Sequence, residues 1–344
     1  MKILCIYLWG HPGCLGGIET FERNLKKMYS QIIFVTYKNV EKKYYDIDDV
    51  IEIDKKRKNF KVVSYILGKY FVLRYFVSRI KYDIALINRP EEIKIIKLKN
   101  KKILIQHTNY EKYLKMYFNN DVKLIEKCKK ELDYFVFLSE YDKERFVKEL
   151  NFPREKAVVI RHTCGMQICE KSKLKNKKLI MVCRLDNKHK RIDLAIHAMK
   201  KLQDFKLNIY GDGEDREYLE NIIKENNLKN VILHGGTNQV KEKLDENGIF
   251  IMTSDYEGYP ISTIEAMRRR LPIVLRNTFD AAPDIVQDNG ILLDKEWNEN
   301  KFVEAVRKIY DNYEHYSENS IKMGKRHDFE VIKKEWDKLL VNLR

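Results

Sequence analysis

The stretch from Ile249 to Asn277, IFIMTSDYEGYPISTIEAMRRRLPIVLRN, indicates the fold of this chain most clearly. An apolar run at Ile249–Ser254 predicts a buried strand, and a polar loop then leads to a helix that begins near Pro260, since proline suits the first helical turn. A second apolar run, Leu271–Asn277, predicts the next strand. Buried strands that alternate with helices form parallel sheets through right-handed crossovers, so this stretch predicts an α/β protein.

The same alternation runs through the whole chain. Six apolar runs precede the polar, basic segment Glu170–Lys178, and six follow it, which predicts two doubly wound, Rossmann-like domains that face each other across a cleft. We assign residues 1–169 to the N-terminal domain, 170–178 to a linker and 179–327 to the C-terminal domain. Residues 328–344 hold a final helical pattern that can pack back across either domain. We assign this helix to the N-terminal domain. The predicted strands are Lys2–Gly10, Gln31–Lys38, Asp83–Arg89, Lys101–Thr108, Tyr134–Ser139, Lys156–His162, Lys178–Leu185, Lys206–Gly211, Asn230–Gly236, Ile249–Ser254, Leu271–Asn277 and Gly290–Asp294.

Length and composition exclude several classes of protein. A chain of 344 residues is long enough for two domains, and 44% hydrophobic with 34% charged residues is typical of a soluble globular protein. We find no apolar run near the ~20 residues that a membrane-spanning helix needs, and the run Ile3–Trp9 is too short for a signal-peptide core. Six scattered cysteines without metal-ligand spacing predict a reducing, cytoplasmic location rather than a disulfide scaffold or a zinc module.

The charge is distributed unevenly. Residues 1–180 carry 39 Lys and Arg against 22 Asp and Glu, a net charge of +17, whereas residues 181–344 carry 27 against 29, a net charge of −2. The first half is therefore suited to an anionic partner. A basic nucleic-acid-binding protein is one such interpretation. Against it, no recognised nucleic-acid module is present, and the basic excess avoids the half with the clearest ligand motifs.

The loop and helix after the strand Ile249–Ser254 form the most informative candidate site, because ligands of such sheets bind beyond the carboxyl ends of the strands. The first N–H groups of the predicted helix, those of Ile261, Ser262 and Thr263, can hold a phosphate. Glu257 before the helix and Glu265 within it can accept hydrogen bonds from the hydroxyls of a sugar or ribose. The pattern suits a sugar nucleotide. The simpler alternative is that Glu265 only favours the helix dipole and Glu257 is a solvated loop residue.

Glu257-Gly258-Tyr259-Pro260, Ile264-Glu265-Ala266 and Leu271-Pro272-Ile273-Val274 together resemble the Glu-x7-Glu signature of retaining glycosyltransferases of family four. That family has the GT-B fold, so the resemblance implies two Rossmann-like domains, of which residues 1–169 are expected to bind the acceptor and residues 179–327 the nucleotide sugar. The resemblance is strong over residues 178–294 and weak over 20–160. Four other segments match the family in order and spacing: Met181–Asp193, Ile209–Gly213, Val231–Gly235 and Gly16–Glu19.

The resemblance assigns roles by position. Arg184 and Lys190 are similar to the pair that neutralises the donor diphosphate, although one extra residue between them leaves Lys188 and Arg191 as substitutes for Lys190. Glu257 matches the residue that contacts donor-sugar hydroxyls, Glu265 the acceptor of the ribose diol, and His107 a histidine near the donor sugar. Gly16 and Gly17 match the turn at which the N-domain backbone approaches the donor. The remaining implied donor-binding residues are Gly235, Gly258, Tyr259, Pro260, Ile261, Ser262 and Thr263.

The resemblance therefore predicts an enzyme that needs no cofactor and no metal site. It is expected to transfer a sugar from a nucleoside-diphosphate sugar, UDP being the default and GDP second, to a glycan or a polyprenyl-diphosphate-linked acceptor, with retention of configuration. A sugar-nucleotide epimerase and an inverting transferase of the same fold are the alternative enzymes, because a fold does not determine chemistry.

A basic aromatic segment, Lys55–Lys81, predicts where the enzyme works. It carries nine Lys and Arg and no acidic residue. At 100° per residue, one helical face collects Lys58, Lys61, Tyr65, Lys69, Phe76 and Arg79, whereas Phe60, Val63, Leu67, Tyr70 and Phe71 lie opposite and are expected to cover the sheet. The basic face suits an anionic membrane surface. We therefore expect a cytoplasmic protein that is peripheral on the inner face of the plasma membrane.

Overall fold

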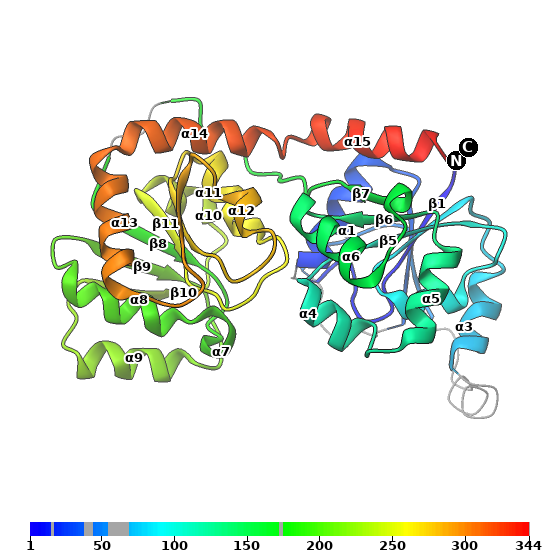
Figure 1. Ribbon diagram of the computed structural model, residues 1–344, viewed down its shortest axis with the longest axis horizontal. Coiled ribbons are helices and arrows are strands. Elements are labelled where there is room, and N and C mark those ends of the chain that lie inside the picture. The colour runs from blue at the N-terminus through cyan, green and yellow to red at the C-terminus, as the bar shows by residue number, and fades with distance from the viewer. Residues whose placement is uncertain (15–16, 38–43, 54–68, 172–174, 344) are drawn as a thin grey trace. The chain divides into compact units, whose positions relative to one another are not determined.

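The computed structural model of the chain forms two compact units (Figure 1). Unit 1 comprises Met1–Thr163 and Ile332–Arg344, and unit 2 comprises Cys164–Val331. The division at Thr163 lies six residues before the predicted linker. The structure describes residues 1–14, 17–37, 44–53, 69–171 and 175–343.

Unit 1 is built on a parallel sheet of seven strands in the order β3-β2-β1-β4-β5-β6-β7. Six of these strands confirm the predicted ones. The third, β3, was missed because it is only three residues long and follows an acidic turn. The bounds are β1 Ile3–Ile6, β2 Ile33–Thr36, β3 Val50–Glu52, β4 Ile84–Ile87, β5 Lys101–Ile105, β6 Tyr134–Phe137 and β7 Ala157–Val159.

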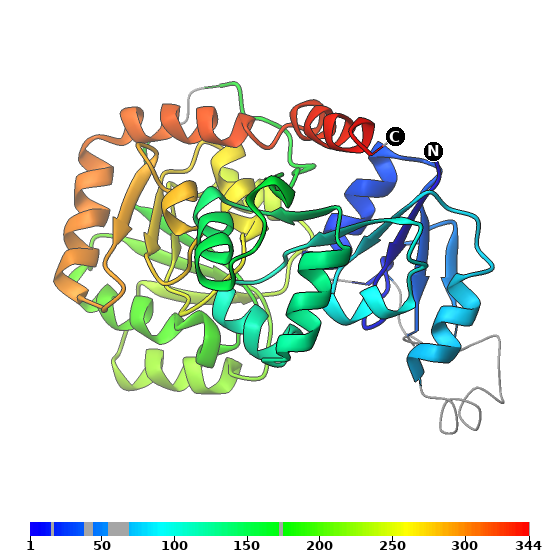
Figure 2. The same ribbon diagram turned by 45° about the vertical axis from the view of Figure 1, so that its right-hand side comes forward.

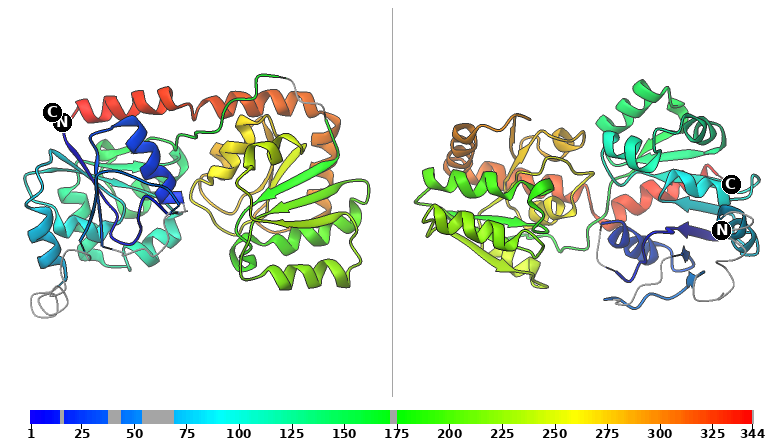
Figure 3. Two further views of the ribbon diagram at one scale, coloured as in Figure 1. Left: turned by 180° about the vertical axis from the view of Figure 1, so that it is seen from behind. Right: turned by 90° about the horizontal axis from the view of Figure 1, so that it is seen from below.

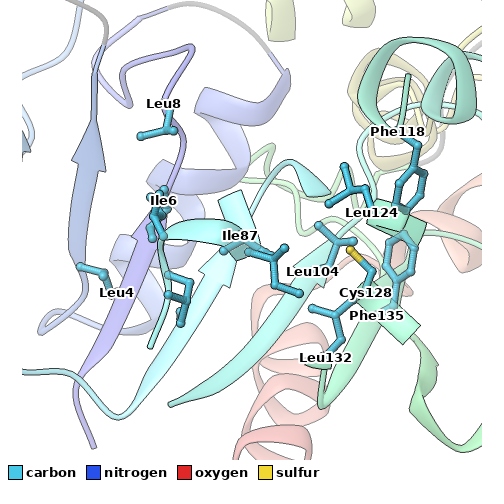
Figure 4. Packing of buried hydrophobic residues seen from close by; sticks show 14 of the residues in the cluster. Leu4, Ile6, Leu8, Ile87, Leu104, Phe118, Leu124, Cys128, Leu132 and Phe135 are labelled. Carbon is cyan, nitrogen blue, oxygen red and sulfur yellow. The ribbon is translucent and has the colours of Figure 1, made fainter. Parts of the chain in front are cut away.

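The core of unit 1 lies where alternate side chains of its strands meet the covering helices (Figure 4). Leu4, Ile87 and Leu104, on three neighbouring strands, belong to the same buried cluster as Leu124 and Cys128 of α5. Such burial contributes about 1.5–3 kcal/mol for each large apolar side chain. The helical segments are α1 Gly17–Met28, α3 Lys69–Val77, η2 Pro90–Ile95, α4 Tyr110–Lys112, η3 Tyr113–Tyr117, α5 Val122–Glu131, α6 Glu140–Leu150, η4 Arg154–Lys156 and α15 Phe329–Val341.

The C-terminal helix α15 completes unit 1. Its Trp336 is buried against Phe21 of α1, with ring centroids 6.2 Å apart. Its Asp337 accepts a hydrogen bond of 2.8 Å from the hydroxyl of Tyr29, just beyond α1. A segment more than 300 residues from α1 in sequence thus closes the layer that α1 begins (Figure 3).

Unit 2 contains a six-stranded parallel sheet in the order β10-β9-β8-β11-β12-β13, and all six strands were predicted. The strands are β8 Lys178–Val182, β9 Lys206–Tyr210, β10 Val231–Gly235, β11 Ile249–Met252, β12 Ile273–Arg276 and β13 Gly290–Leu293. The helical segments are α7 Asn187–Lys190, α8 Ile192–Ala198, η5 Met199–Lys201, α9 Arg216–Glu225, α10 Val240–Asp245, α11 Ile261–Arg268, α12 Ala282–Ile285, α13 Glu299–Asp311 and α14 Tyr313–Lys325.

Three consecutive arginines at the end of α11 hold the chain that enters unit 2. Arg268 donates to the carbonyl of Met166, Arg269 to that of Gln167 at 2.8 Å, and Arg270 to that of Cys169 at 2.8 Å. Arg268 also donates to the carbonyl of Gly324 in α14. The bonds to Met166, Gln167 and Cys169 give hydrogen-bond donors to carbonyls of a segment that lies outside any strand or helix.

In both sheets the strand order reverses beside the first strand. Chain connections leave β1 and β4 in opposite directions in unit 1, and β8 and β11 in unit 2 (Figure 2). Loops beyond the carboxyl ends of such a pair diverge, and this topological switch point is where open α/β sheets bind ligands. The topology therefore marks one candidate site in each unit.

The side chains that helix α3 exposes differ from those predicted for its basic outer face. Phe71 was expected to cover the sheet but is 62% exposed, and Phe76 was expected on the outer face but packs against the core. The buried residues of this helix are Val72, Leu73 and Val77, so its apolar stripe is rotated from the predicted one. Residues 54–68, with the expected Lys58, Lys61 and Tyr65, lie outside the described residues. In the part of the chain that the structure describes, we find no helix whose length and apolar character suit a membrane crossing.

Candidate functional site

The switch point of unit 2 joins two predicted site residues. The Lys190 ammonium, after β8, lies 2.5 Å from a carboxylate oxygen of Glu257, after β11. Both side chains are mostly buried. The Thr253 hydroxyl holds the two loops together, at 3.1 Å from the carbonyl of Lys190 and 2.8 Å from that of Arg191. Residues 67 positions apart thus form a rigid ion pair at the edge of the sheet.

The ion pair keeps Lys190 charged. Burial lowers the pKa of this lysine, but the Glu257 carboxylate outweighs burial, so the pKa lies above its usual value. Of the substitutes, Arg191 pairs instead with Asp193 and Asp255, and Lys188 is exposed. Lys190 is therefore the member of this basic run that lies against the Glu257 carboxylate.

Arg184 lies in the same loop but is not joined to this pair. Its side chain is 68% exposed and contacts Glu214 at 3.3 Å. The Gly211-Asp212-Gly213 turn supports the loop, because a Cβ on Gly211 would lie 1.7 Å from the Cys183 carbonyl oxygen. Gly211 also has a φ of +147°, a conformation that favours glycine. The glycines of this turn therefore allow two loops to pack closely.

Helix α11 begins one residue later than predicted, with Pro260 as its N-cap. The N–H groups of Ile261 and Ser262 have no acceptor within the helix, as at any helix start. Thr263 corrects the prediction, because both its N–H and its hydroxyl bond to the carbonyl of Pro260, at 3.2 and 2.6 Å. Thr263 is also fully buried, and its two donors are already used within the first turn of the helix.

The side chain of Tyr259 supports the loop before α11. It is buried, and its hydroxyl lies 3.2 Å from Asp284 and 3.3 Å from Nε2 of His327. The side chain thus anchors the loop between Glu257 and α11 to α12 and to the end of α14. Sequence reasoning missed Asp284 and His327, and no local pattern pointed to them.

Glu265 lies on α11 without a charged partner. Burial raises the pKa of its carboxyl to about 7. Among the described residues, no side chain donates a hydrogen bond to this carboxylate. A buried carboxyl without a partner, such as that of Glu265, is a typical acceptor for ligand hydroxyls.

Gly235, at the end of β10, has a φ of +86°, and its carbonyl accepts a 2.9 Å bond from the Gly211 N–H.

In unit 1, His107 follows β5 and contacts Asn88, which follows β4. Nε2 of His107 lies 2.6 Å from Oδ1 of Asn88. The Asn88 amide nitrogen donates to the carbonyl of Ile6 at 2.9 Å, which leaves Oδ1 as the acceptor and makes Nε2 of His107 the protonated nitrogen. Burial, together with His162 and Arg89, lowers the pKa of His107 well below its usual value, so the ring is neutral.

Buried polar groups lie behind this histidine. Glu22 of α1 accepts from the Cys5 thiol at 3.6 Å and from the Asn88 amide at 3.4 Å. Burial raises the pKa of Glu22 well above its usual range. Sequence reasoning missed Glu22 and Asn88, although Asn88 ends a predicted strand, the position that the carboxyl-end rule singles out. Of the predicted glycine turn, Gly17 is the first residue of α1, and Gly16 lies outside the described residues.

Comparison with known proteins finds a family model that is similar to most of unit 2. Residues 168–327 match the family model for glycosyl transferases group 1. This segment contains Lys190, Glu257 and Glu265. The solved structure of Anabaena HepE in complex with UDP and glucose is similar to this chain with a TM-score of 0.76, at 14% identity over 99% of both chains. Together with the two parallel sheets, this likeness shows the GT-B fold that the resemblance implied.

Two curated relatives match part of the chain. A poly(ribitol-phosphate) alpha-N-acetylglucosaminyltransferase of Staphylococcus aureus is 32% identical over 130 residues, which are 36% of this chain and 26% of that protein. The O-antigen biosynthesis glycosyltransferase WbnH of Escherichia coli is 26% identical over 186 residues, 54% of this chain and 53% of that protein. This chain therefore spans about a quarter of one relative and about half of the other.

The raised pKa of Glu265 predicts a pH-dependent stability. A carboxyl that titrates near 4.5 when unfolded and near 7 when folded stabilises the protein fully below pH 4.5, and this contribution is lost as the pH rises through 7. Glu265→Gln has no carboxyl to ionise, so this loss does not occur in the variant. Its free energy of unfolding should exceed that of the wild type by about 1–3 kcal/mol at pH 8 and by little at pH 4.5. Urea unfolding at both pH values measures the difference. The exposed Glu217→Gln gives the control, and an equal difference at both pH values would contradict the assignment.

Proposed function

We propose that this chain is a retaining glycosyltransferase that moves a sugar from a nucleoside-diphosphate sugar to a glycan or a lipid-linked acceptor, in the synthesis of a surface polysaccharide or glycoconjugate. The observation that carries this proposal is the ion pair of Lys190 and Glu257 at the switch point of unit 2. The Lys190 ammonium and the Glu257 carboxylate form this pair, and Glu257 lies in the loop that leads directly into the N-terminus of α11. This is the chemistry that a diphosphate and a sugar need together.

Each residue takes a role that suits its surroundings. Lys190 neutralises the diphosphate as the sugar leaves, and the exposed Arg184 closes on the same group. Glu257 accepts hydrogen bonds from the donor sugar, and Glu265 accepts them from the ribose diol. Nε2 of the neutral His107 of unit 1 donates to Asn88, so its Nδ1 can accept a hydrogen bond from a sugar hydroxyl. In the reaction, the bond from the anomeric carbon to the diphosphate breaks, a bond to the acceptor oxygen forms on the same face, and the acceptor hydroxyl passes its proton to an oxygen of the departing diphosphate.

The donor that we propose is a UDP-sugar. HepE, which shares the fold, binds UDP and glucose in its solved complex, and this supports UDP over GDP. One curated relative is named as a poly(ribitol-phosphate) alpha-N-acetylglucosaminyltransferase and the other as an O-antigen biosynthesis glycosyltransferase, and both names support a polymeric glycan or glycoconjugate as the product. We therefore place the acceptor among surface glycans and their polyprenyl-diphosphate-linked precursors.

The ion pair predicts coupled effects on catalysis. Glu257→Gln and Lys190→Gln should each remove about 2–4 kcal/mol of transition-state stabilisation, a fall of roughly 30- to 1,000-fold in kcat/KM. Because the two groups act on each other, the double variant should lose less than the two single losses combined. Steady-state kinetics with UDP-sugars measures all three variants.

Glu217→Gln, on the exposed face of α9, serves as the matched control and should turn over like the wild type. Circular dichroism checks that each variant is folded. Wild-type rates in both single variants would remove this pair from the active site.

The proposed chemistry also predicts the response to chelators and the configuration of the product. Because Lys190 and Arg184 supply the positive charge at the diphosphate, EDTA should change the transfer rate by less than twofold. The product should keep the α configuration of the donor. Proton NMR of the first product formed measures the anomer, with Mn²⁺- and Mg²⁺-supplemented reactions as controls. Loss of activity in EDTA that Mn²⁺ restores, or a β product, would contradict this mechanism.

We propose in addition that the enzyme works at the inner face of the plasma membrane. The exposed face of α3 and the following turn supports this, since Phe71, Arg74, Tyr75 and Arg79 all lie on it. The Arg79 guanidinium lies 4.4 Å from the ring centre of Tyr75. Aromatic rings beside arginines suit the headgroup layer of an anionic membrane.

Sedimentation with phosphatidylglycerol vesicles tests this location. Each basic residue near an anionic surface contributes about 1 kcal/mol, so changing Arg74 and Arg79 to Glu should lower the bound fraction at least tenfold at low salt. The Lys224→Glu, Lys229→Glu double variant makes the same charge change on exposed positions of unit 2 and should bind like the wild type. Equal loss in both double variants, or no binding by the wild type, would contradict the membrane proposal.

A further inference from the structure

The switch point of unit 1 carries an aromatic cluster to which the mechanism assigns no task. Trp9 follows β1, Arg89 and Glu91 follow β4, and Tyr117 ends the helical segment after β5. Trp9 is 42% exposed, an unusual position for so large a ring. These four residues, which we call the Trp9 platform, come from three segments that meet at one edge of the sheet.

Charged groups fix the orientation of the platform. The Arg89 guanidinium lies 5.4 Å from the ring centre of Trp9 and 4.5 Å from that of Tyr117. The indole N–H of Trp9 donates to Glu91 at 3.3 Å, and Glu91 lies 3.9 Å from Arg89. Cation–π contacts of this kind contribute about 0.5–2 kcal/mol each, so the indole is oriented before any ligand arrives.

The platform has the chemistry that recognises a sugar ring. An indole face attracts the weakly positive C–H groups of a pyranose, since the π-system is negative on its face. The neighbouring carboxylate accepts hydrogen bonds from hydroxyls, and the guanidinium donates to ring and hydroxyl oxygens. Flat apolar contact with a few polar groups at its border is also how small-molecule sites gain orientation.

The local charge selects a neutral sugar. Arg89 is the cation of the platform, and the Glu91 carboxylate lies 3.9 Å from it. One carboxylate beside one guanidinium leaves no net positive charge for a phosphate or a uronate, although the half of the chain that contains them is strongly basic.

We propose that the Trp9 platform binds a neutral pyranose ring of the acceptor, with the ring stacked on Trp9 and its hydroxyls bonded to Glu91 and Arg89. The proposal rests on the proposed glycosyl transfer and adds the acceptor class to it. An acceptor that carries phosphate or carboxylate must hold those groups elsewhere on the protein.

Two measurements on the full chain test the platform. The first compares transfer to methyl α-glucoside and methyl α-N-acetylglucosaminide with hydrolysis of the UDP-sugar in the absence of acceptor. Trp9→Ala should raise the acceptor KM at least tenfold and leave hydrolysis within twofold, and Trp9→Phe should retain most of the affinity. Glu91→Gln should give an intermediate loss. The exposed Tyr218→Ala of unit 2, which removes an aromatic ring far along the chain, is the matched control.

The second measurement needs no turnover. Titration of the wild type with the same glycosides should change tryptophan fluorescence, and Trp9→Phe, which keeps Trp297 and Trp336, should abolish the change. Methyl glucuronoside should bind at least tenfold more weakly than the neutral glycosides.

The two measurements separate the possible failures. A wild type that neither transfers nor hydrolyses UDP-sugars, but still shows the Trp9-dependent fluorescence change, would overturn the proposed function and support the platform. Unchanged acceptor KM in Trp9→Ala, absence of a fluorescence change with every glycoside, or equal binding of the glucuronoside would overturn the platform and leave the transferase proposal intact.

Discussion

The reversal of strand order in each parallel sheet is the constraint on which the candidate sites depend. Parallel strands send all their carboxyl ends to one edge, and the reversal makes two neighbouring loops diverge there. In unit 2 this brings Lys190 and Glu257 together from loops 67 residues apart. In unit 1 it brings Trp9 beside Arg89 and places Asn88 against His107.

Environment then decides the charge of each carboxyl group. Glu257 has an ammonium partner and forms an ion pair, whereas Glu265 has none and its pKa rises to about 7. Glu22 is buried beside a thiol and an amide, and burial raises its pKa well above the usual range. The same residue type therefore occurs as the counter-ion of a lysine, as a buried carboxyl without a charged partner, and as part of a buried polar network.

Rigidity around the unit 2 site comes from polar contacts far apart in sequence. The Thr253 hydroxyl bonds the loop of Lys190, and the buried Tyr259 hydroxyl ties the loop after Glu257 to Asp284 and His327. At the other end of α11, the three arginines from Arg268 hold the incoming chain by its carbonyls. A site with supported loops loses less entropy when it binds a ligand.

The sequence by itself determined the elements of this protein. Apolar runs predicted twelve strands that the structure contains, because a strand covered on both faces must be apolar throughout. The short β3 was missed, since three residues hold too little pattern. The loop around Glu257 and Glu265 also stood out, because helix starts and carboxylates are local signals.

Only the tertiary structure decided how side chains were used. Phe71 and Phe76 exchanged their expected faces because the rotation of a helix depends on what it packs against. Thr263 bonds within its own helix start, Tyr259 is buried against Asp284 and His327, and Arg184 contacts Glu214 rather than the Lys190–Glu257 pair. Trp9 and Arg89 are eighty residues apart and have no common pattern. Which groups meet depends on strand order, and strand order is set by packing over the whole sheet, which no local stretch of sequence records.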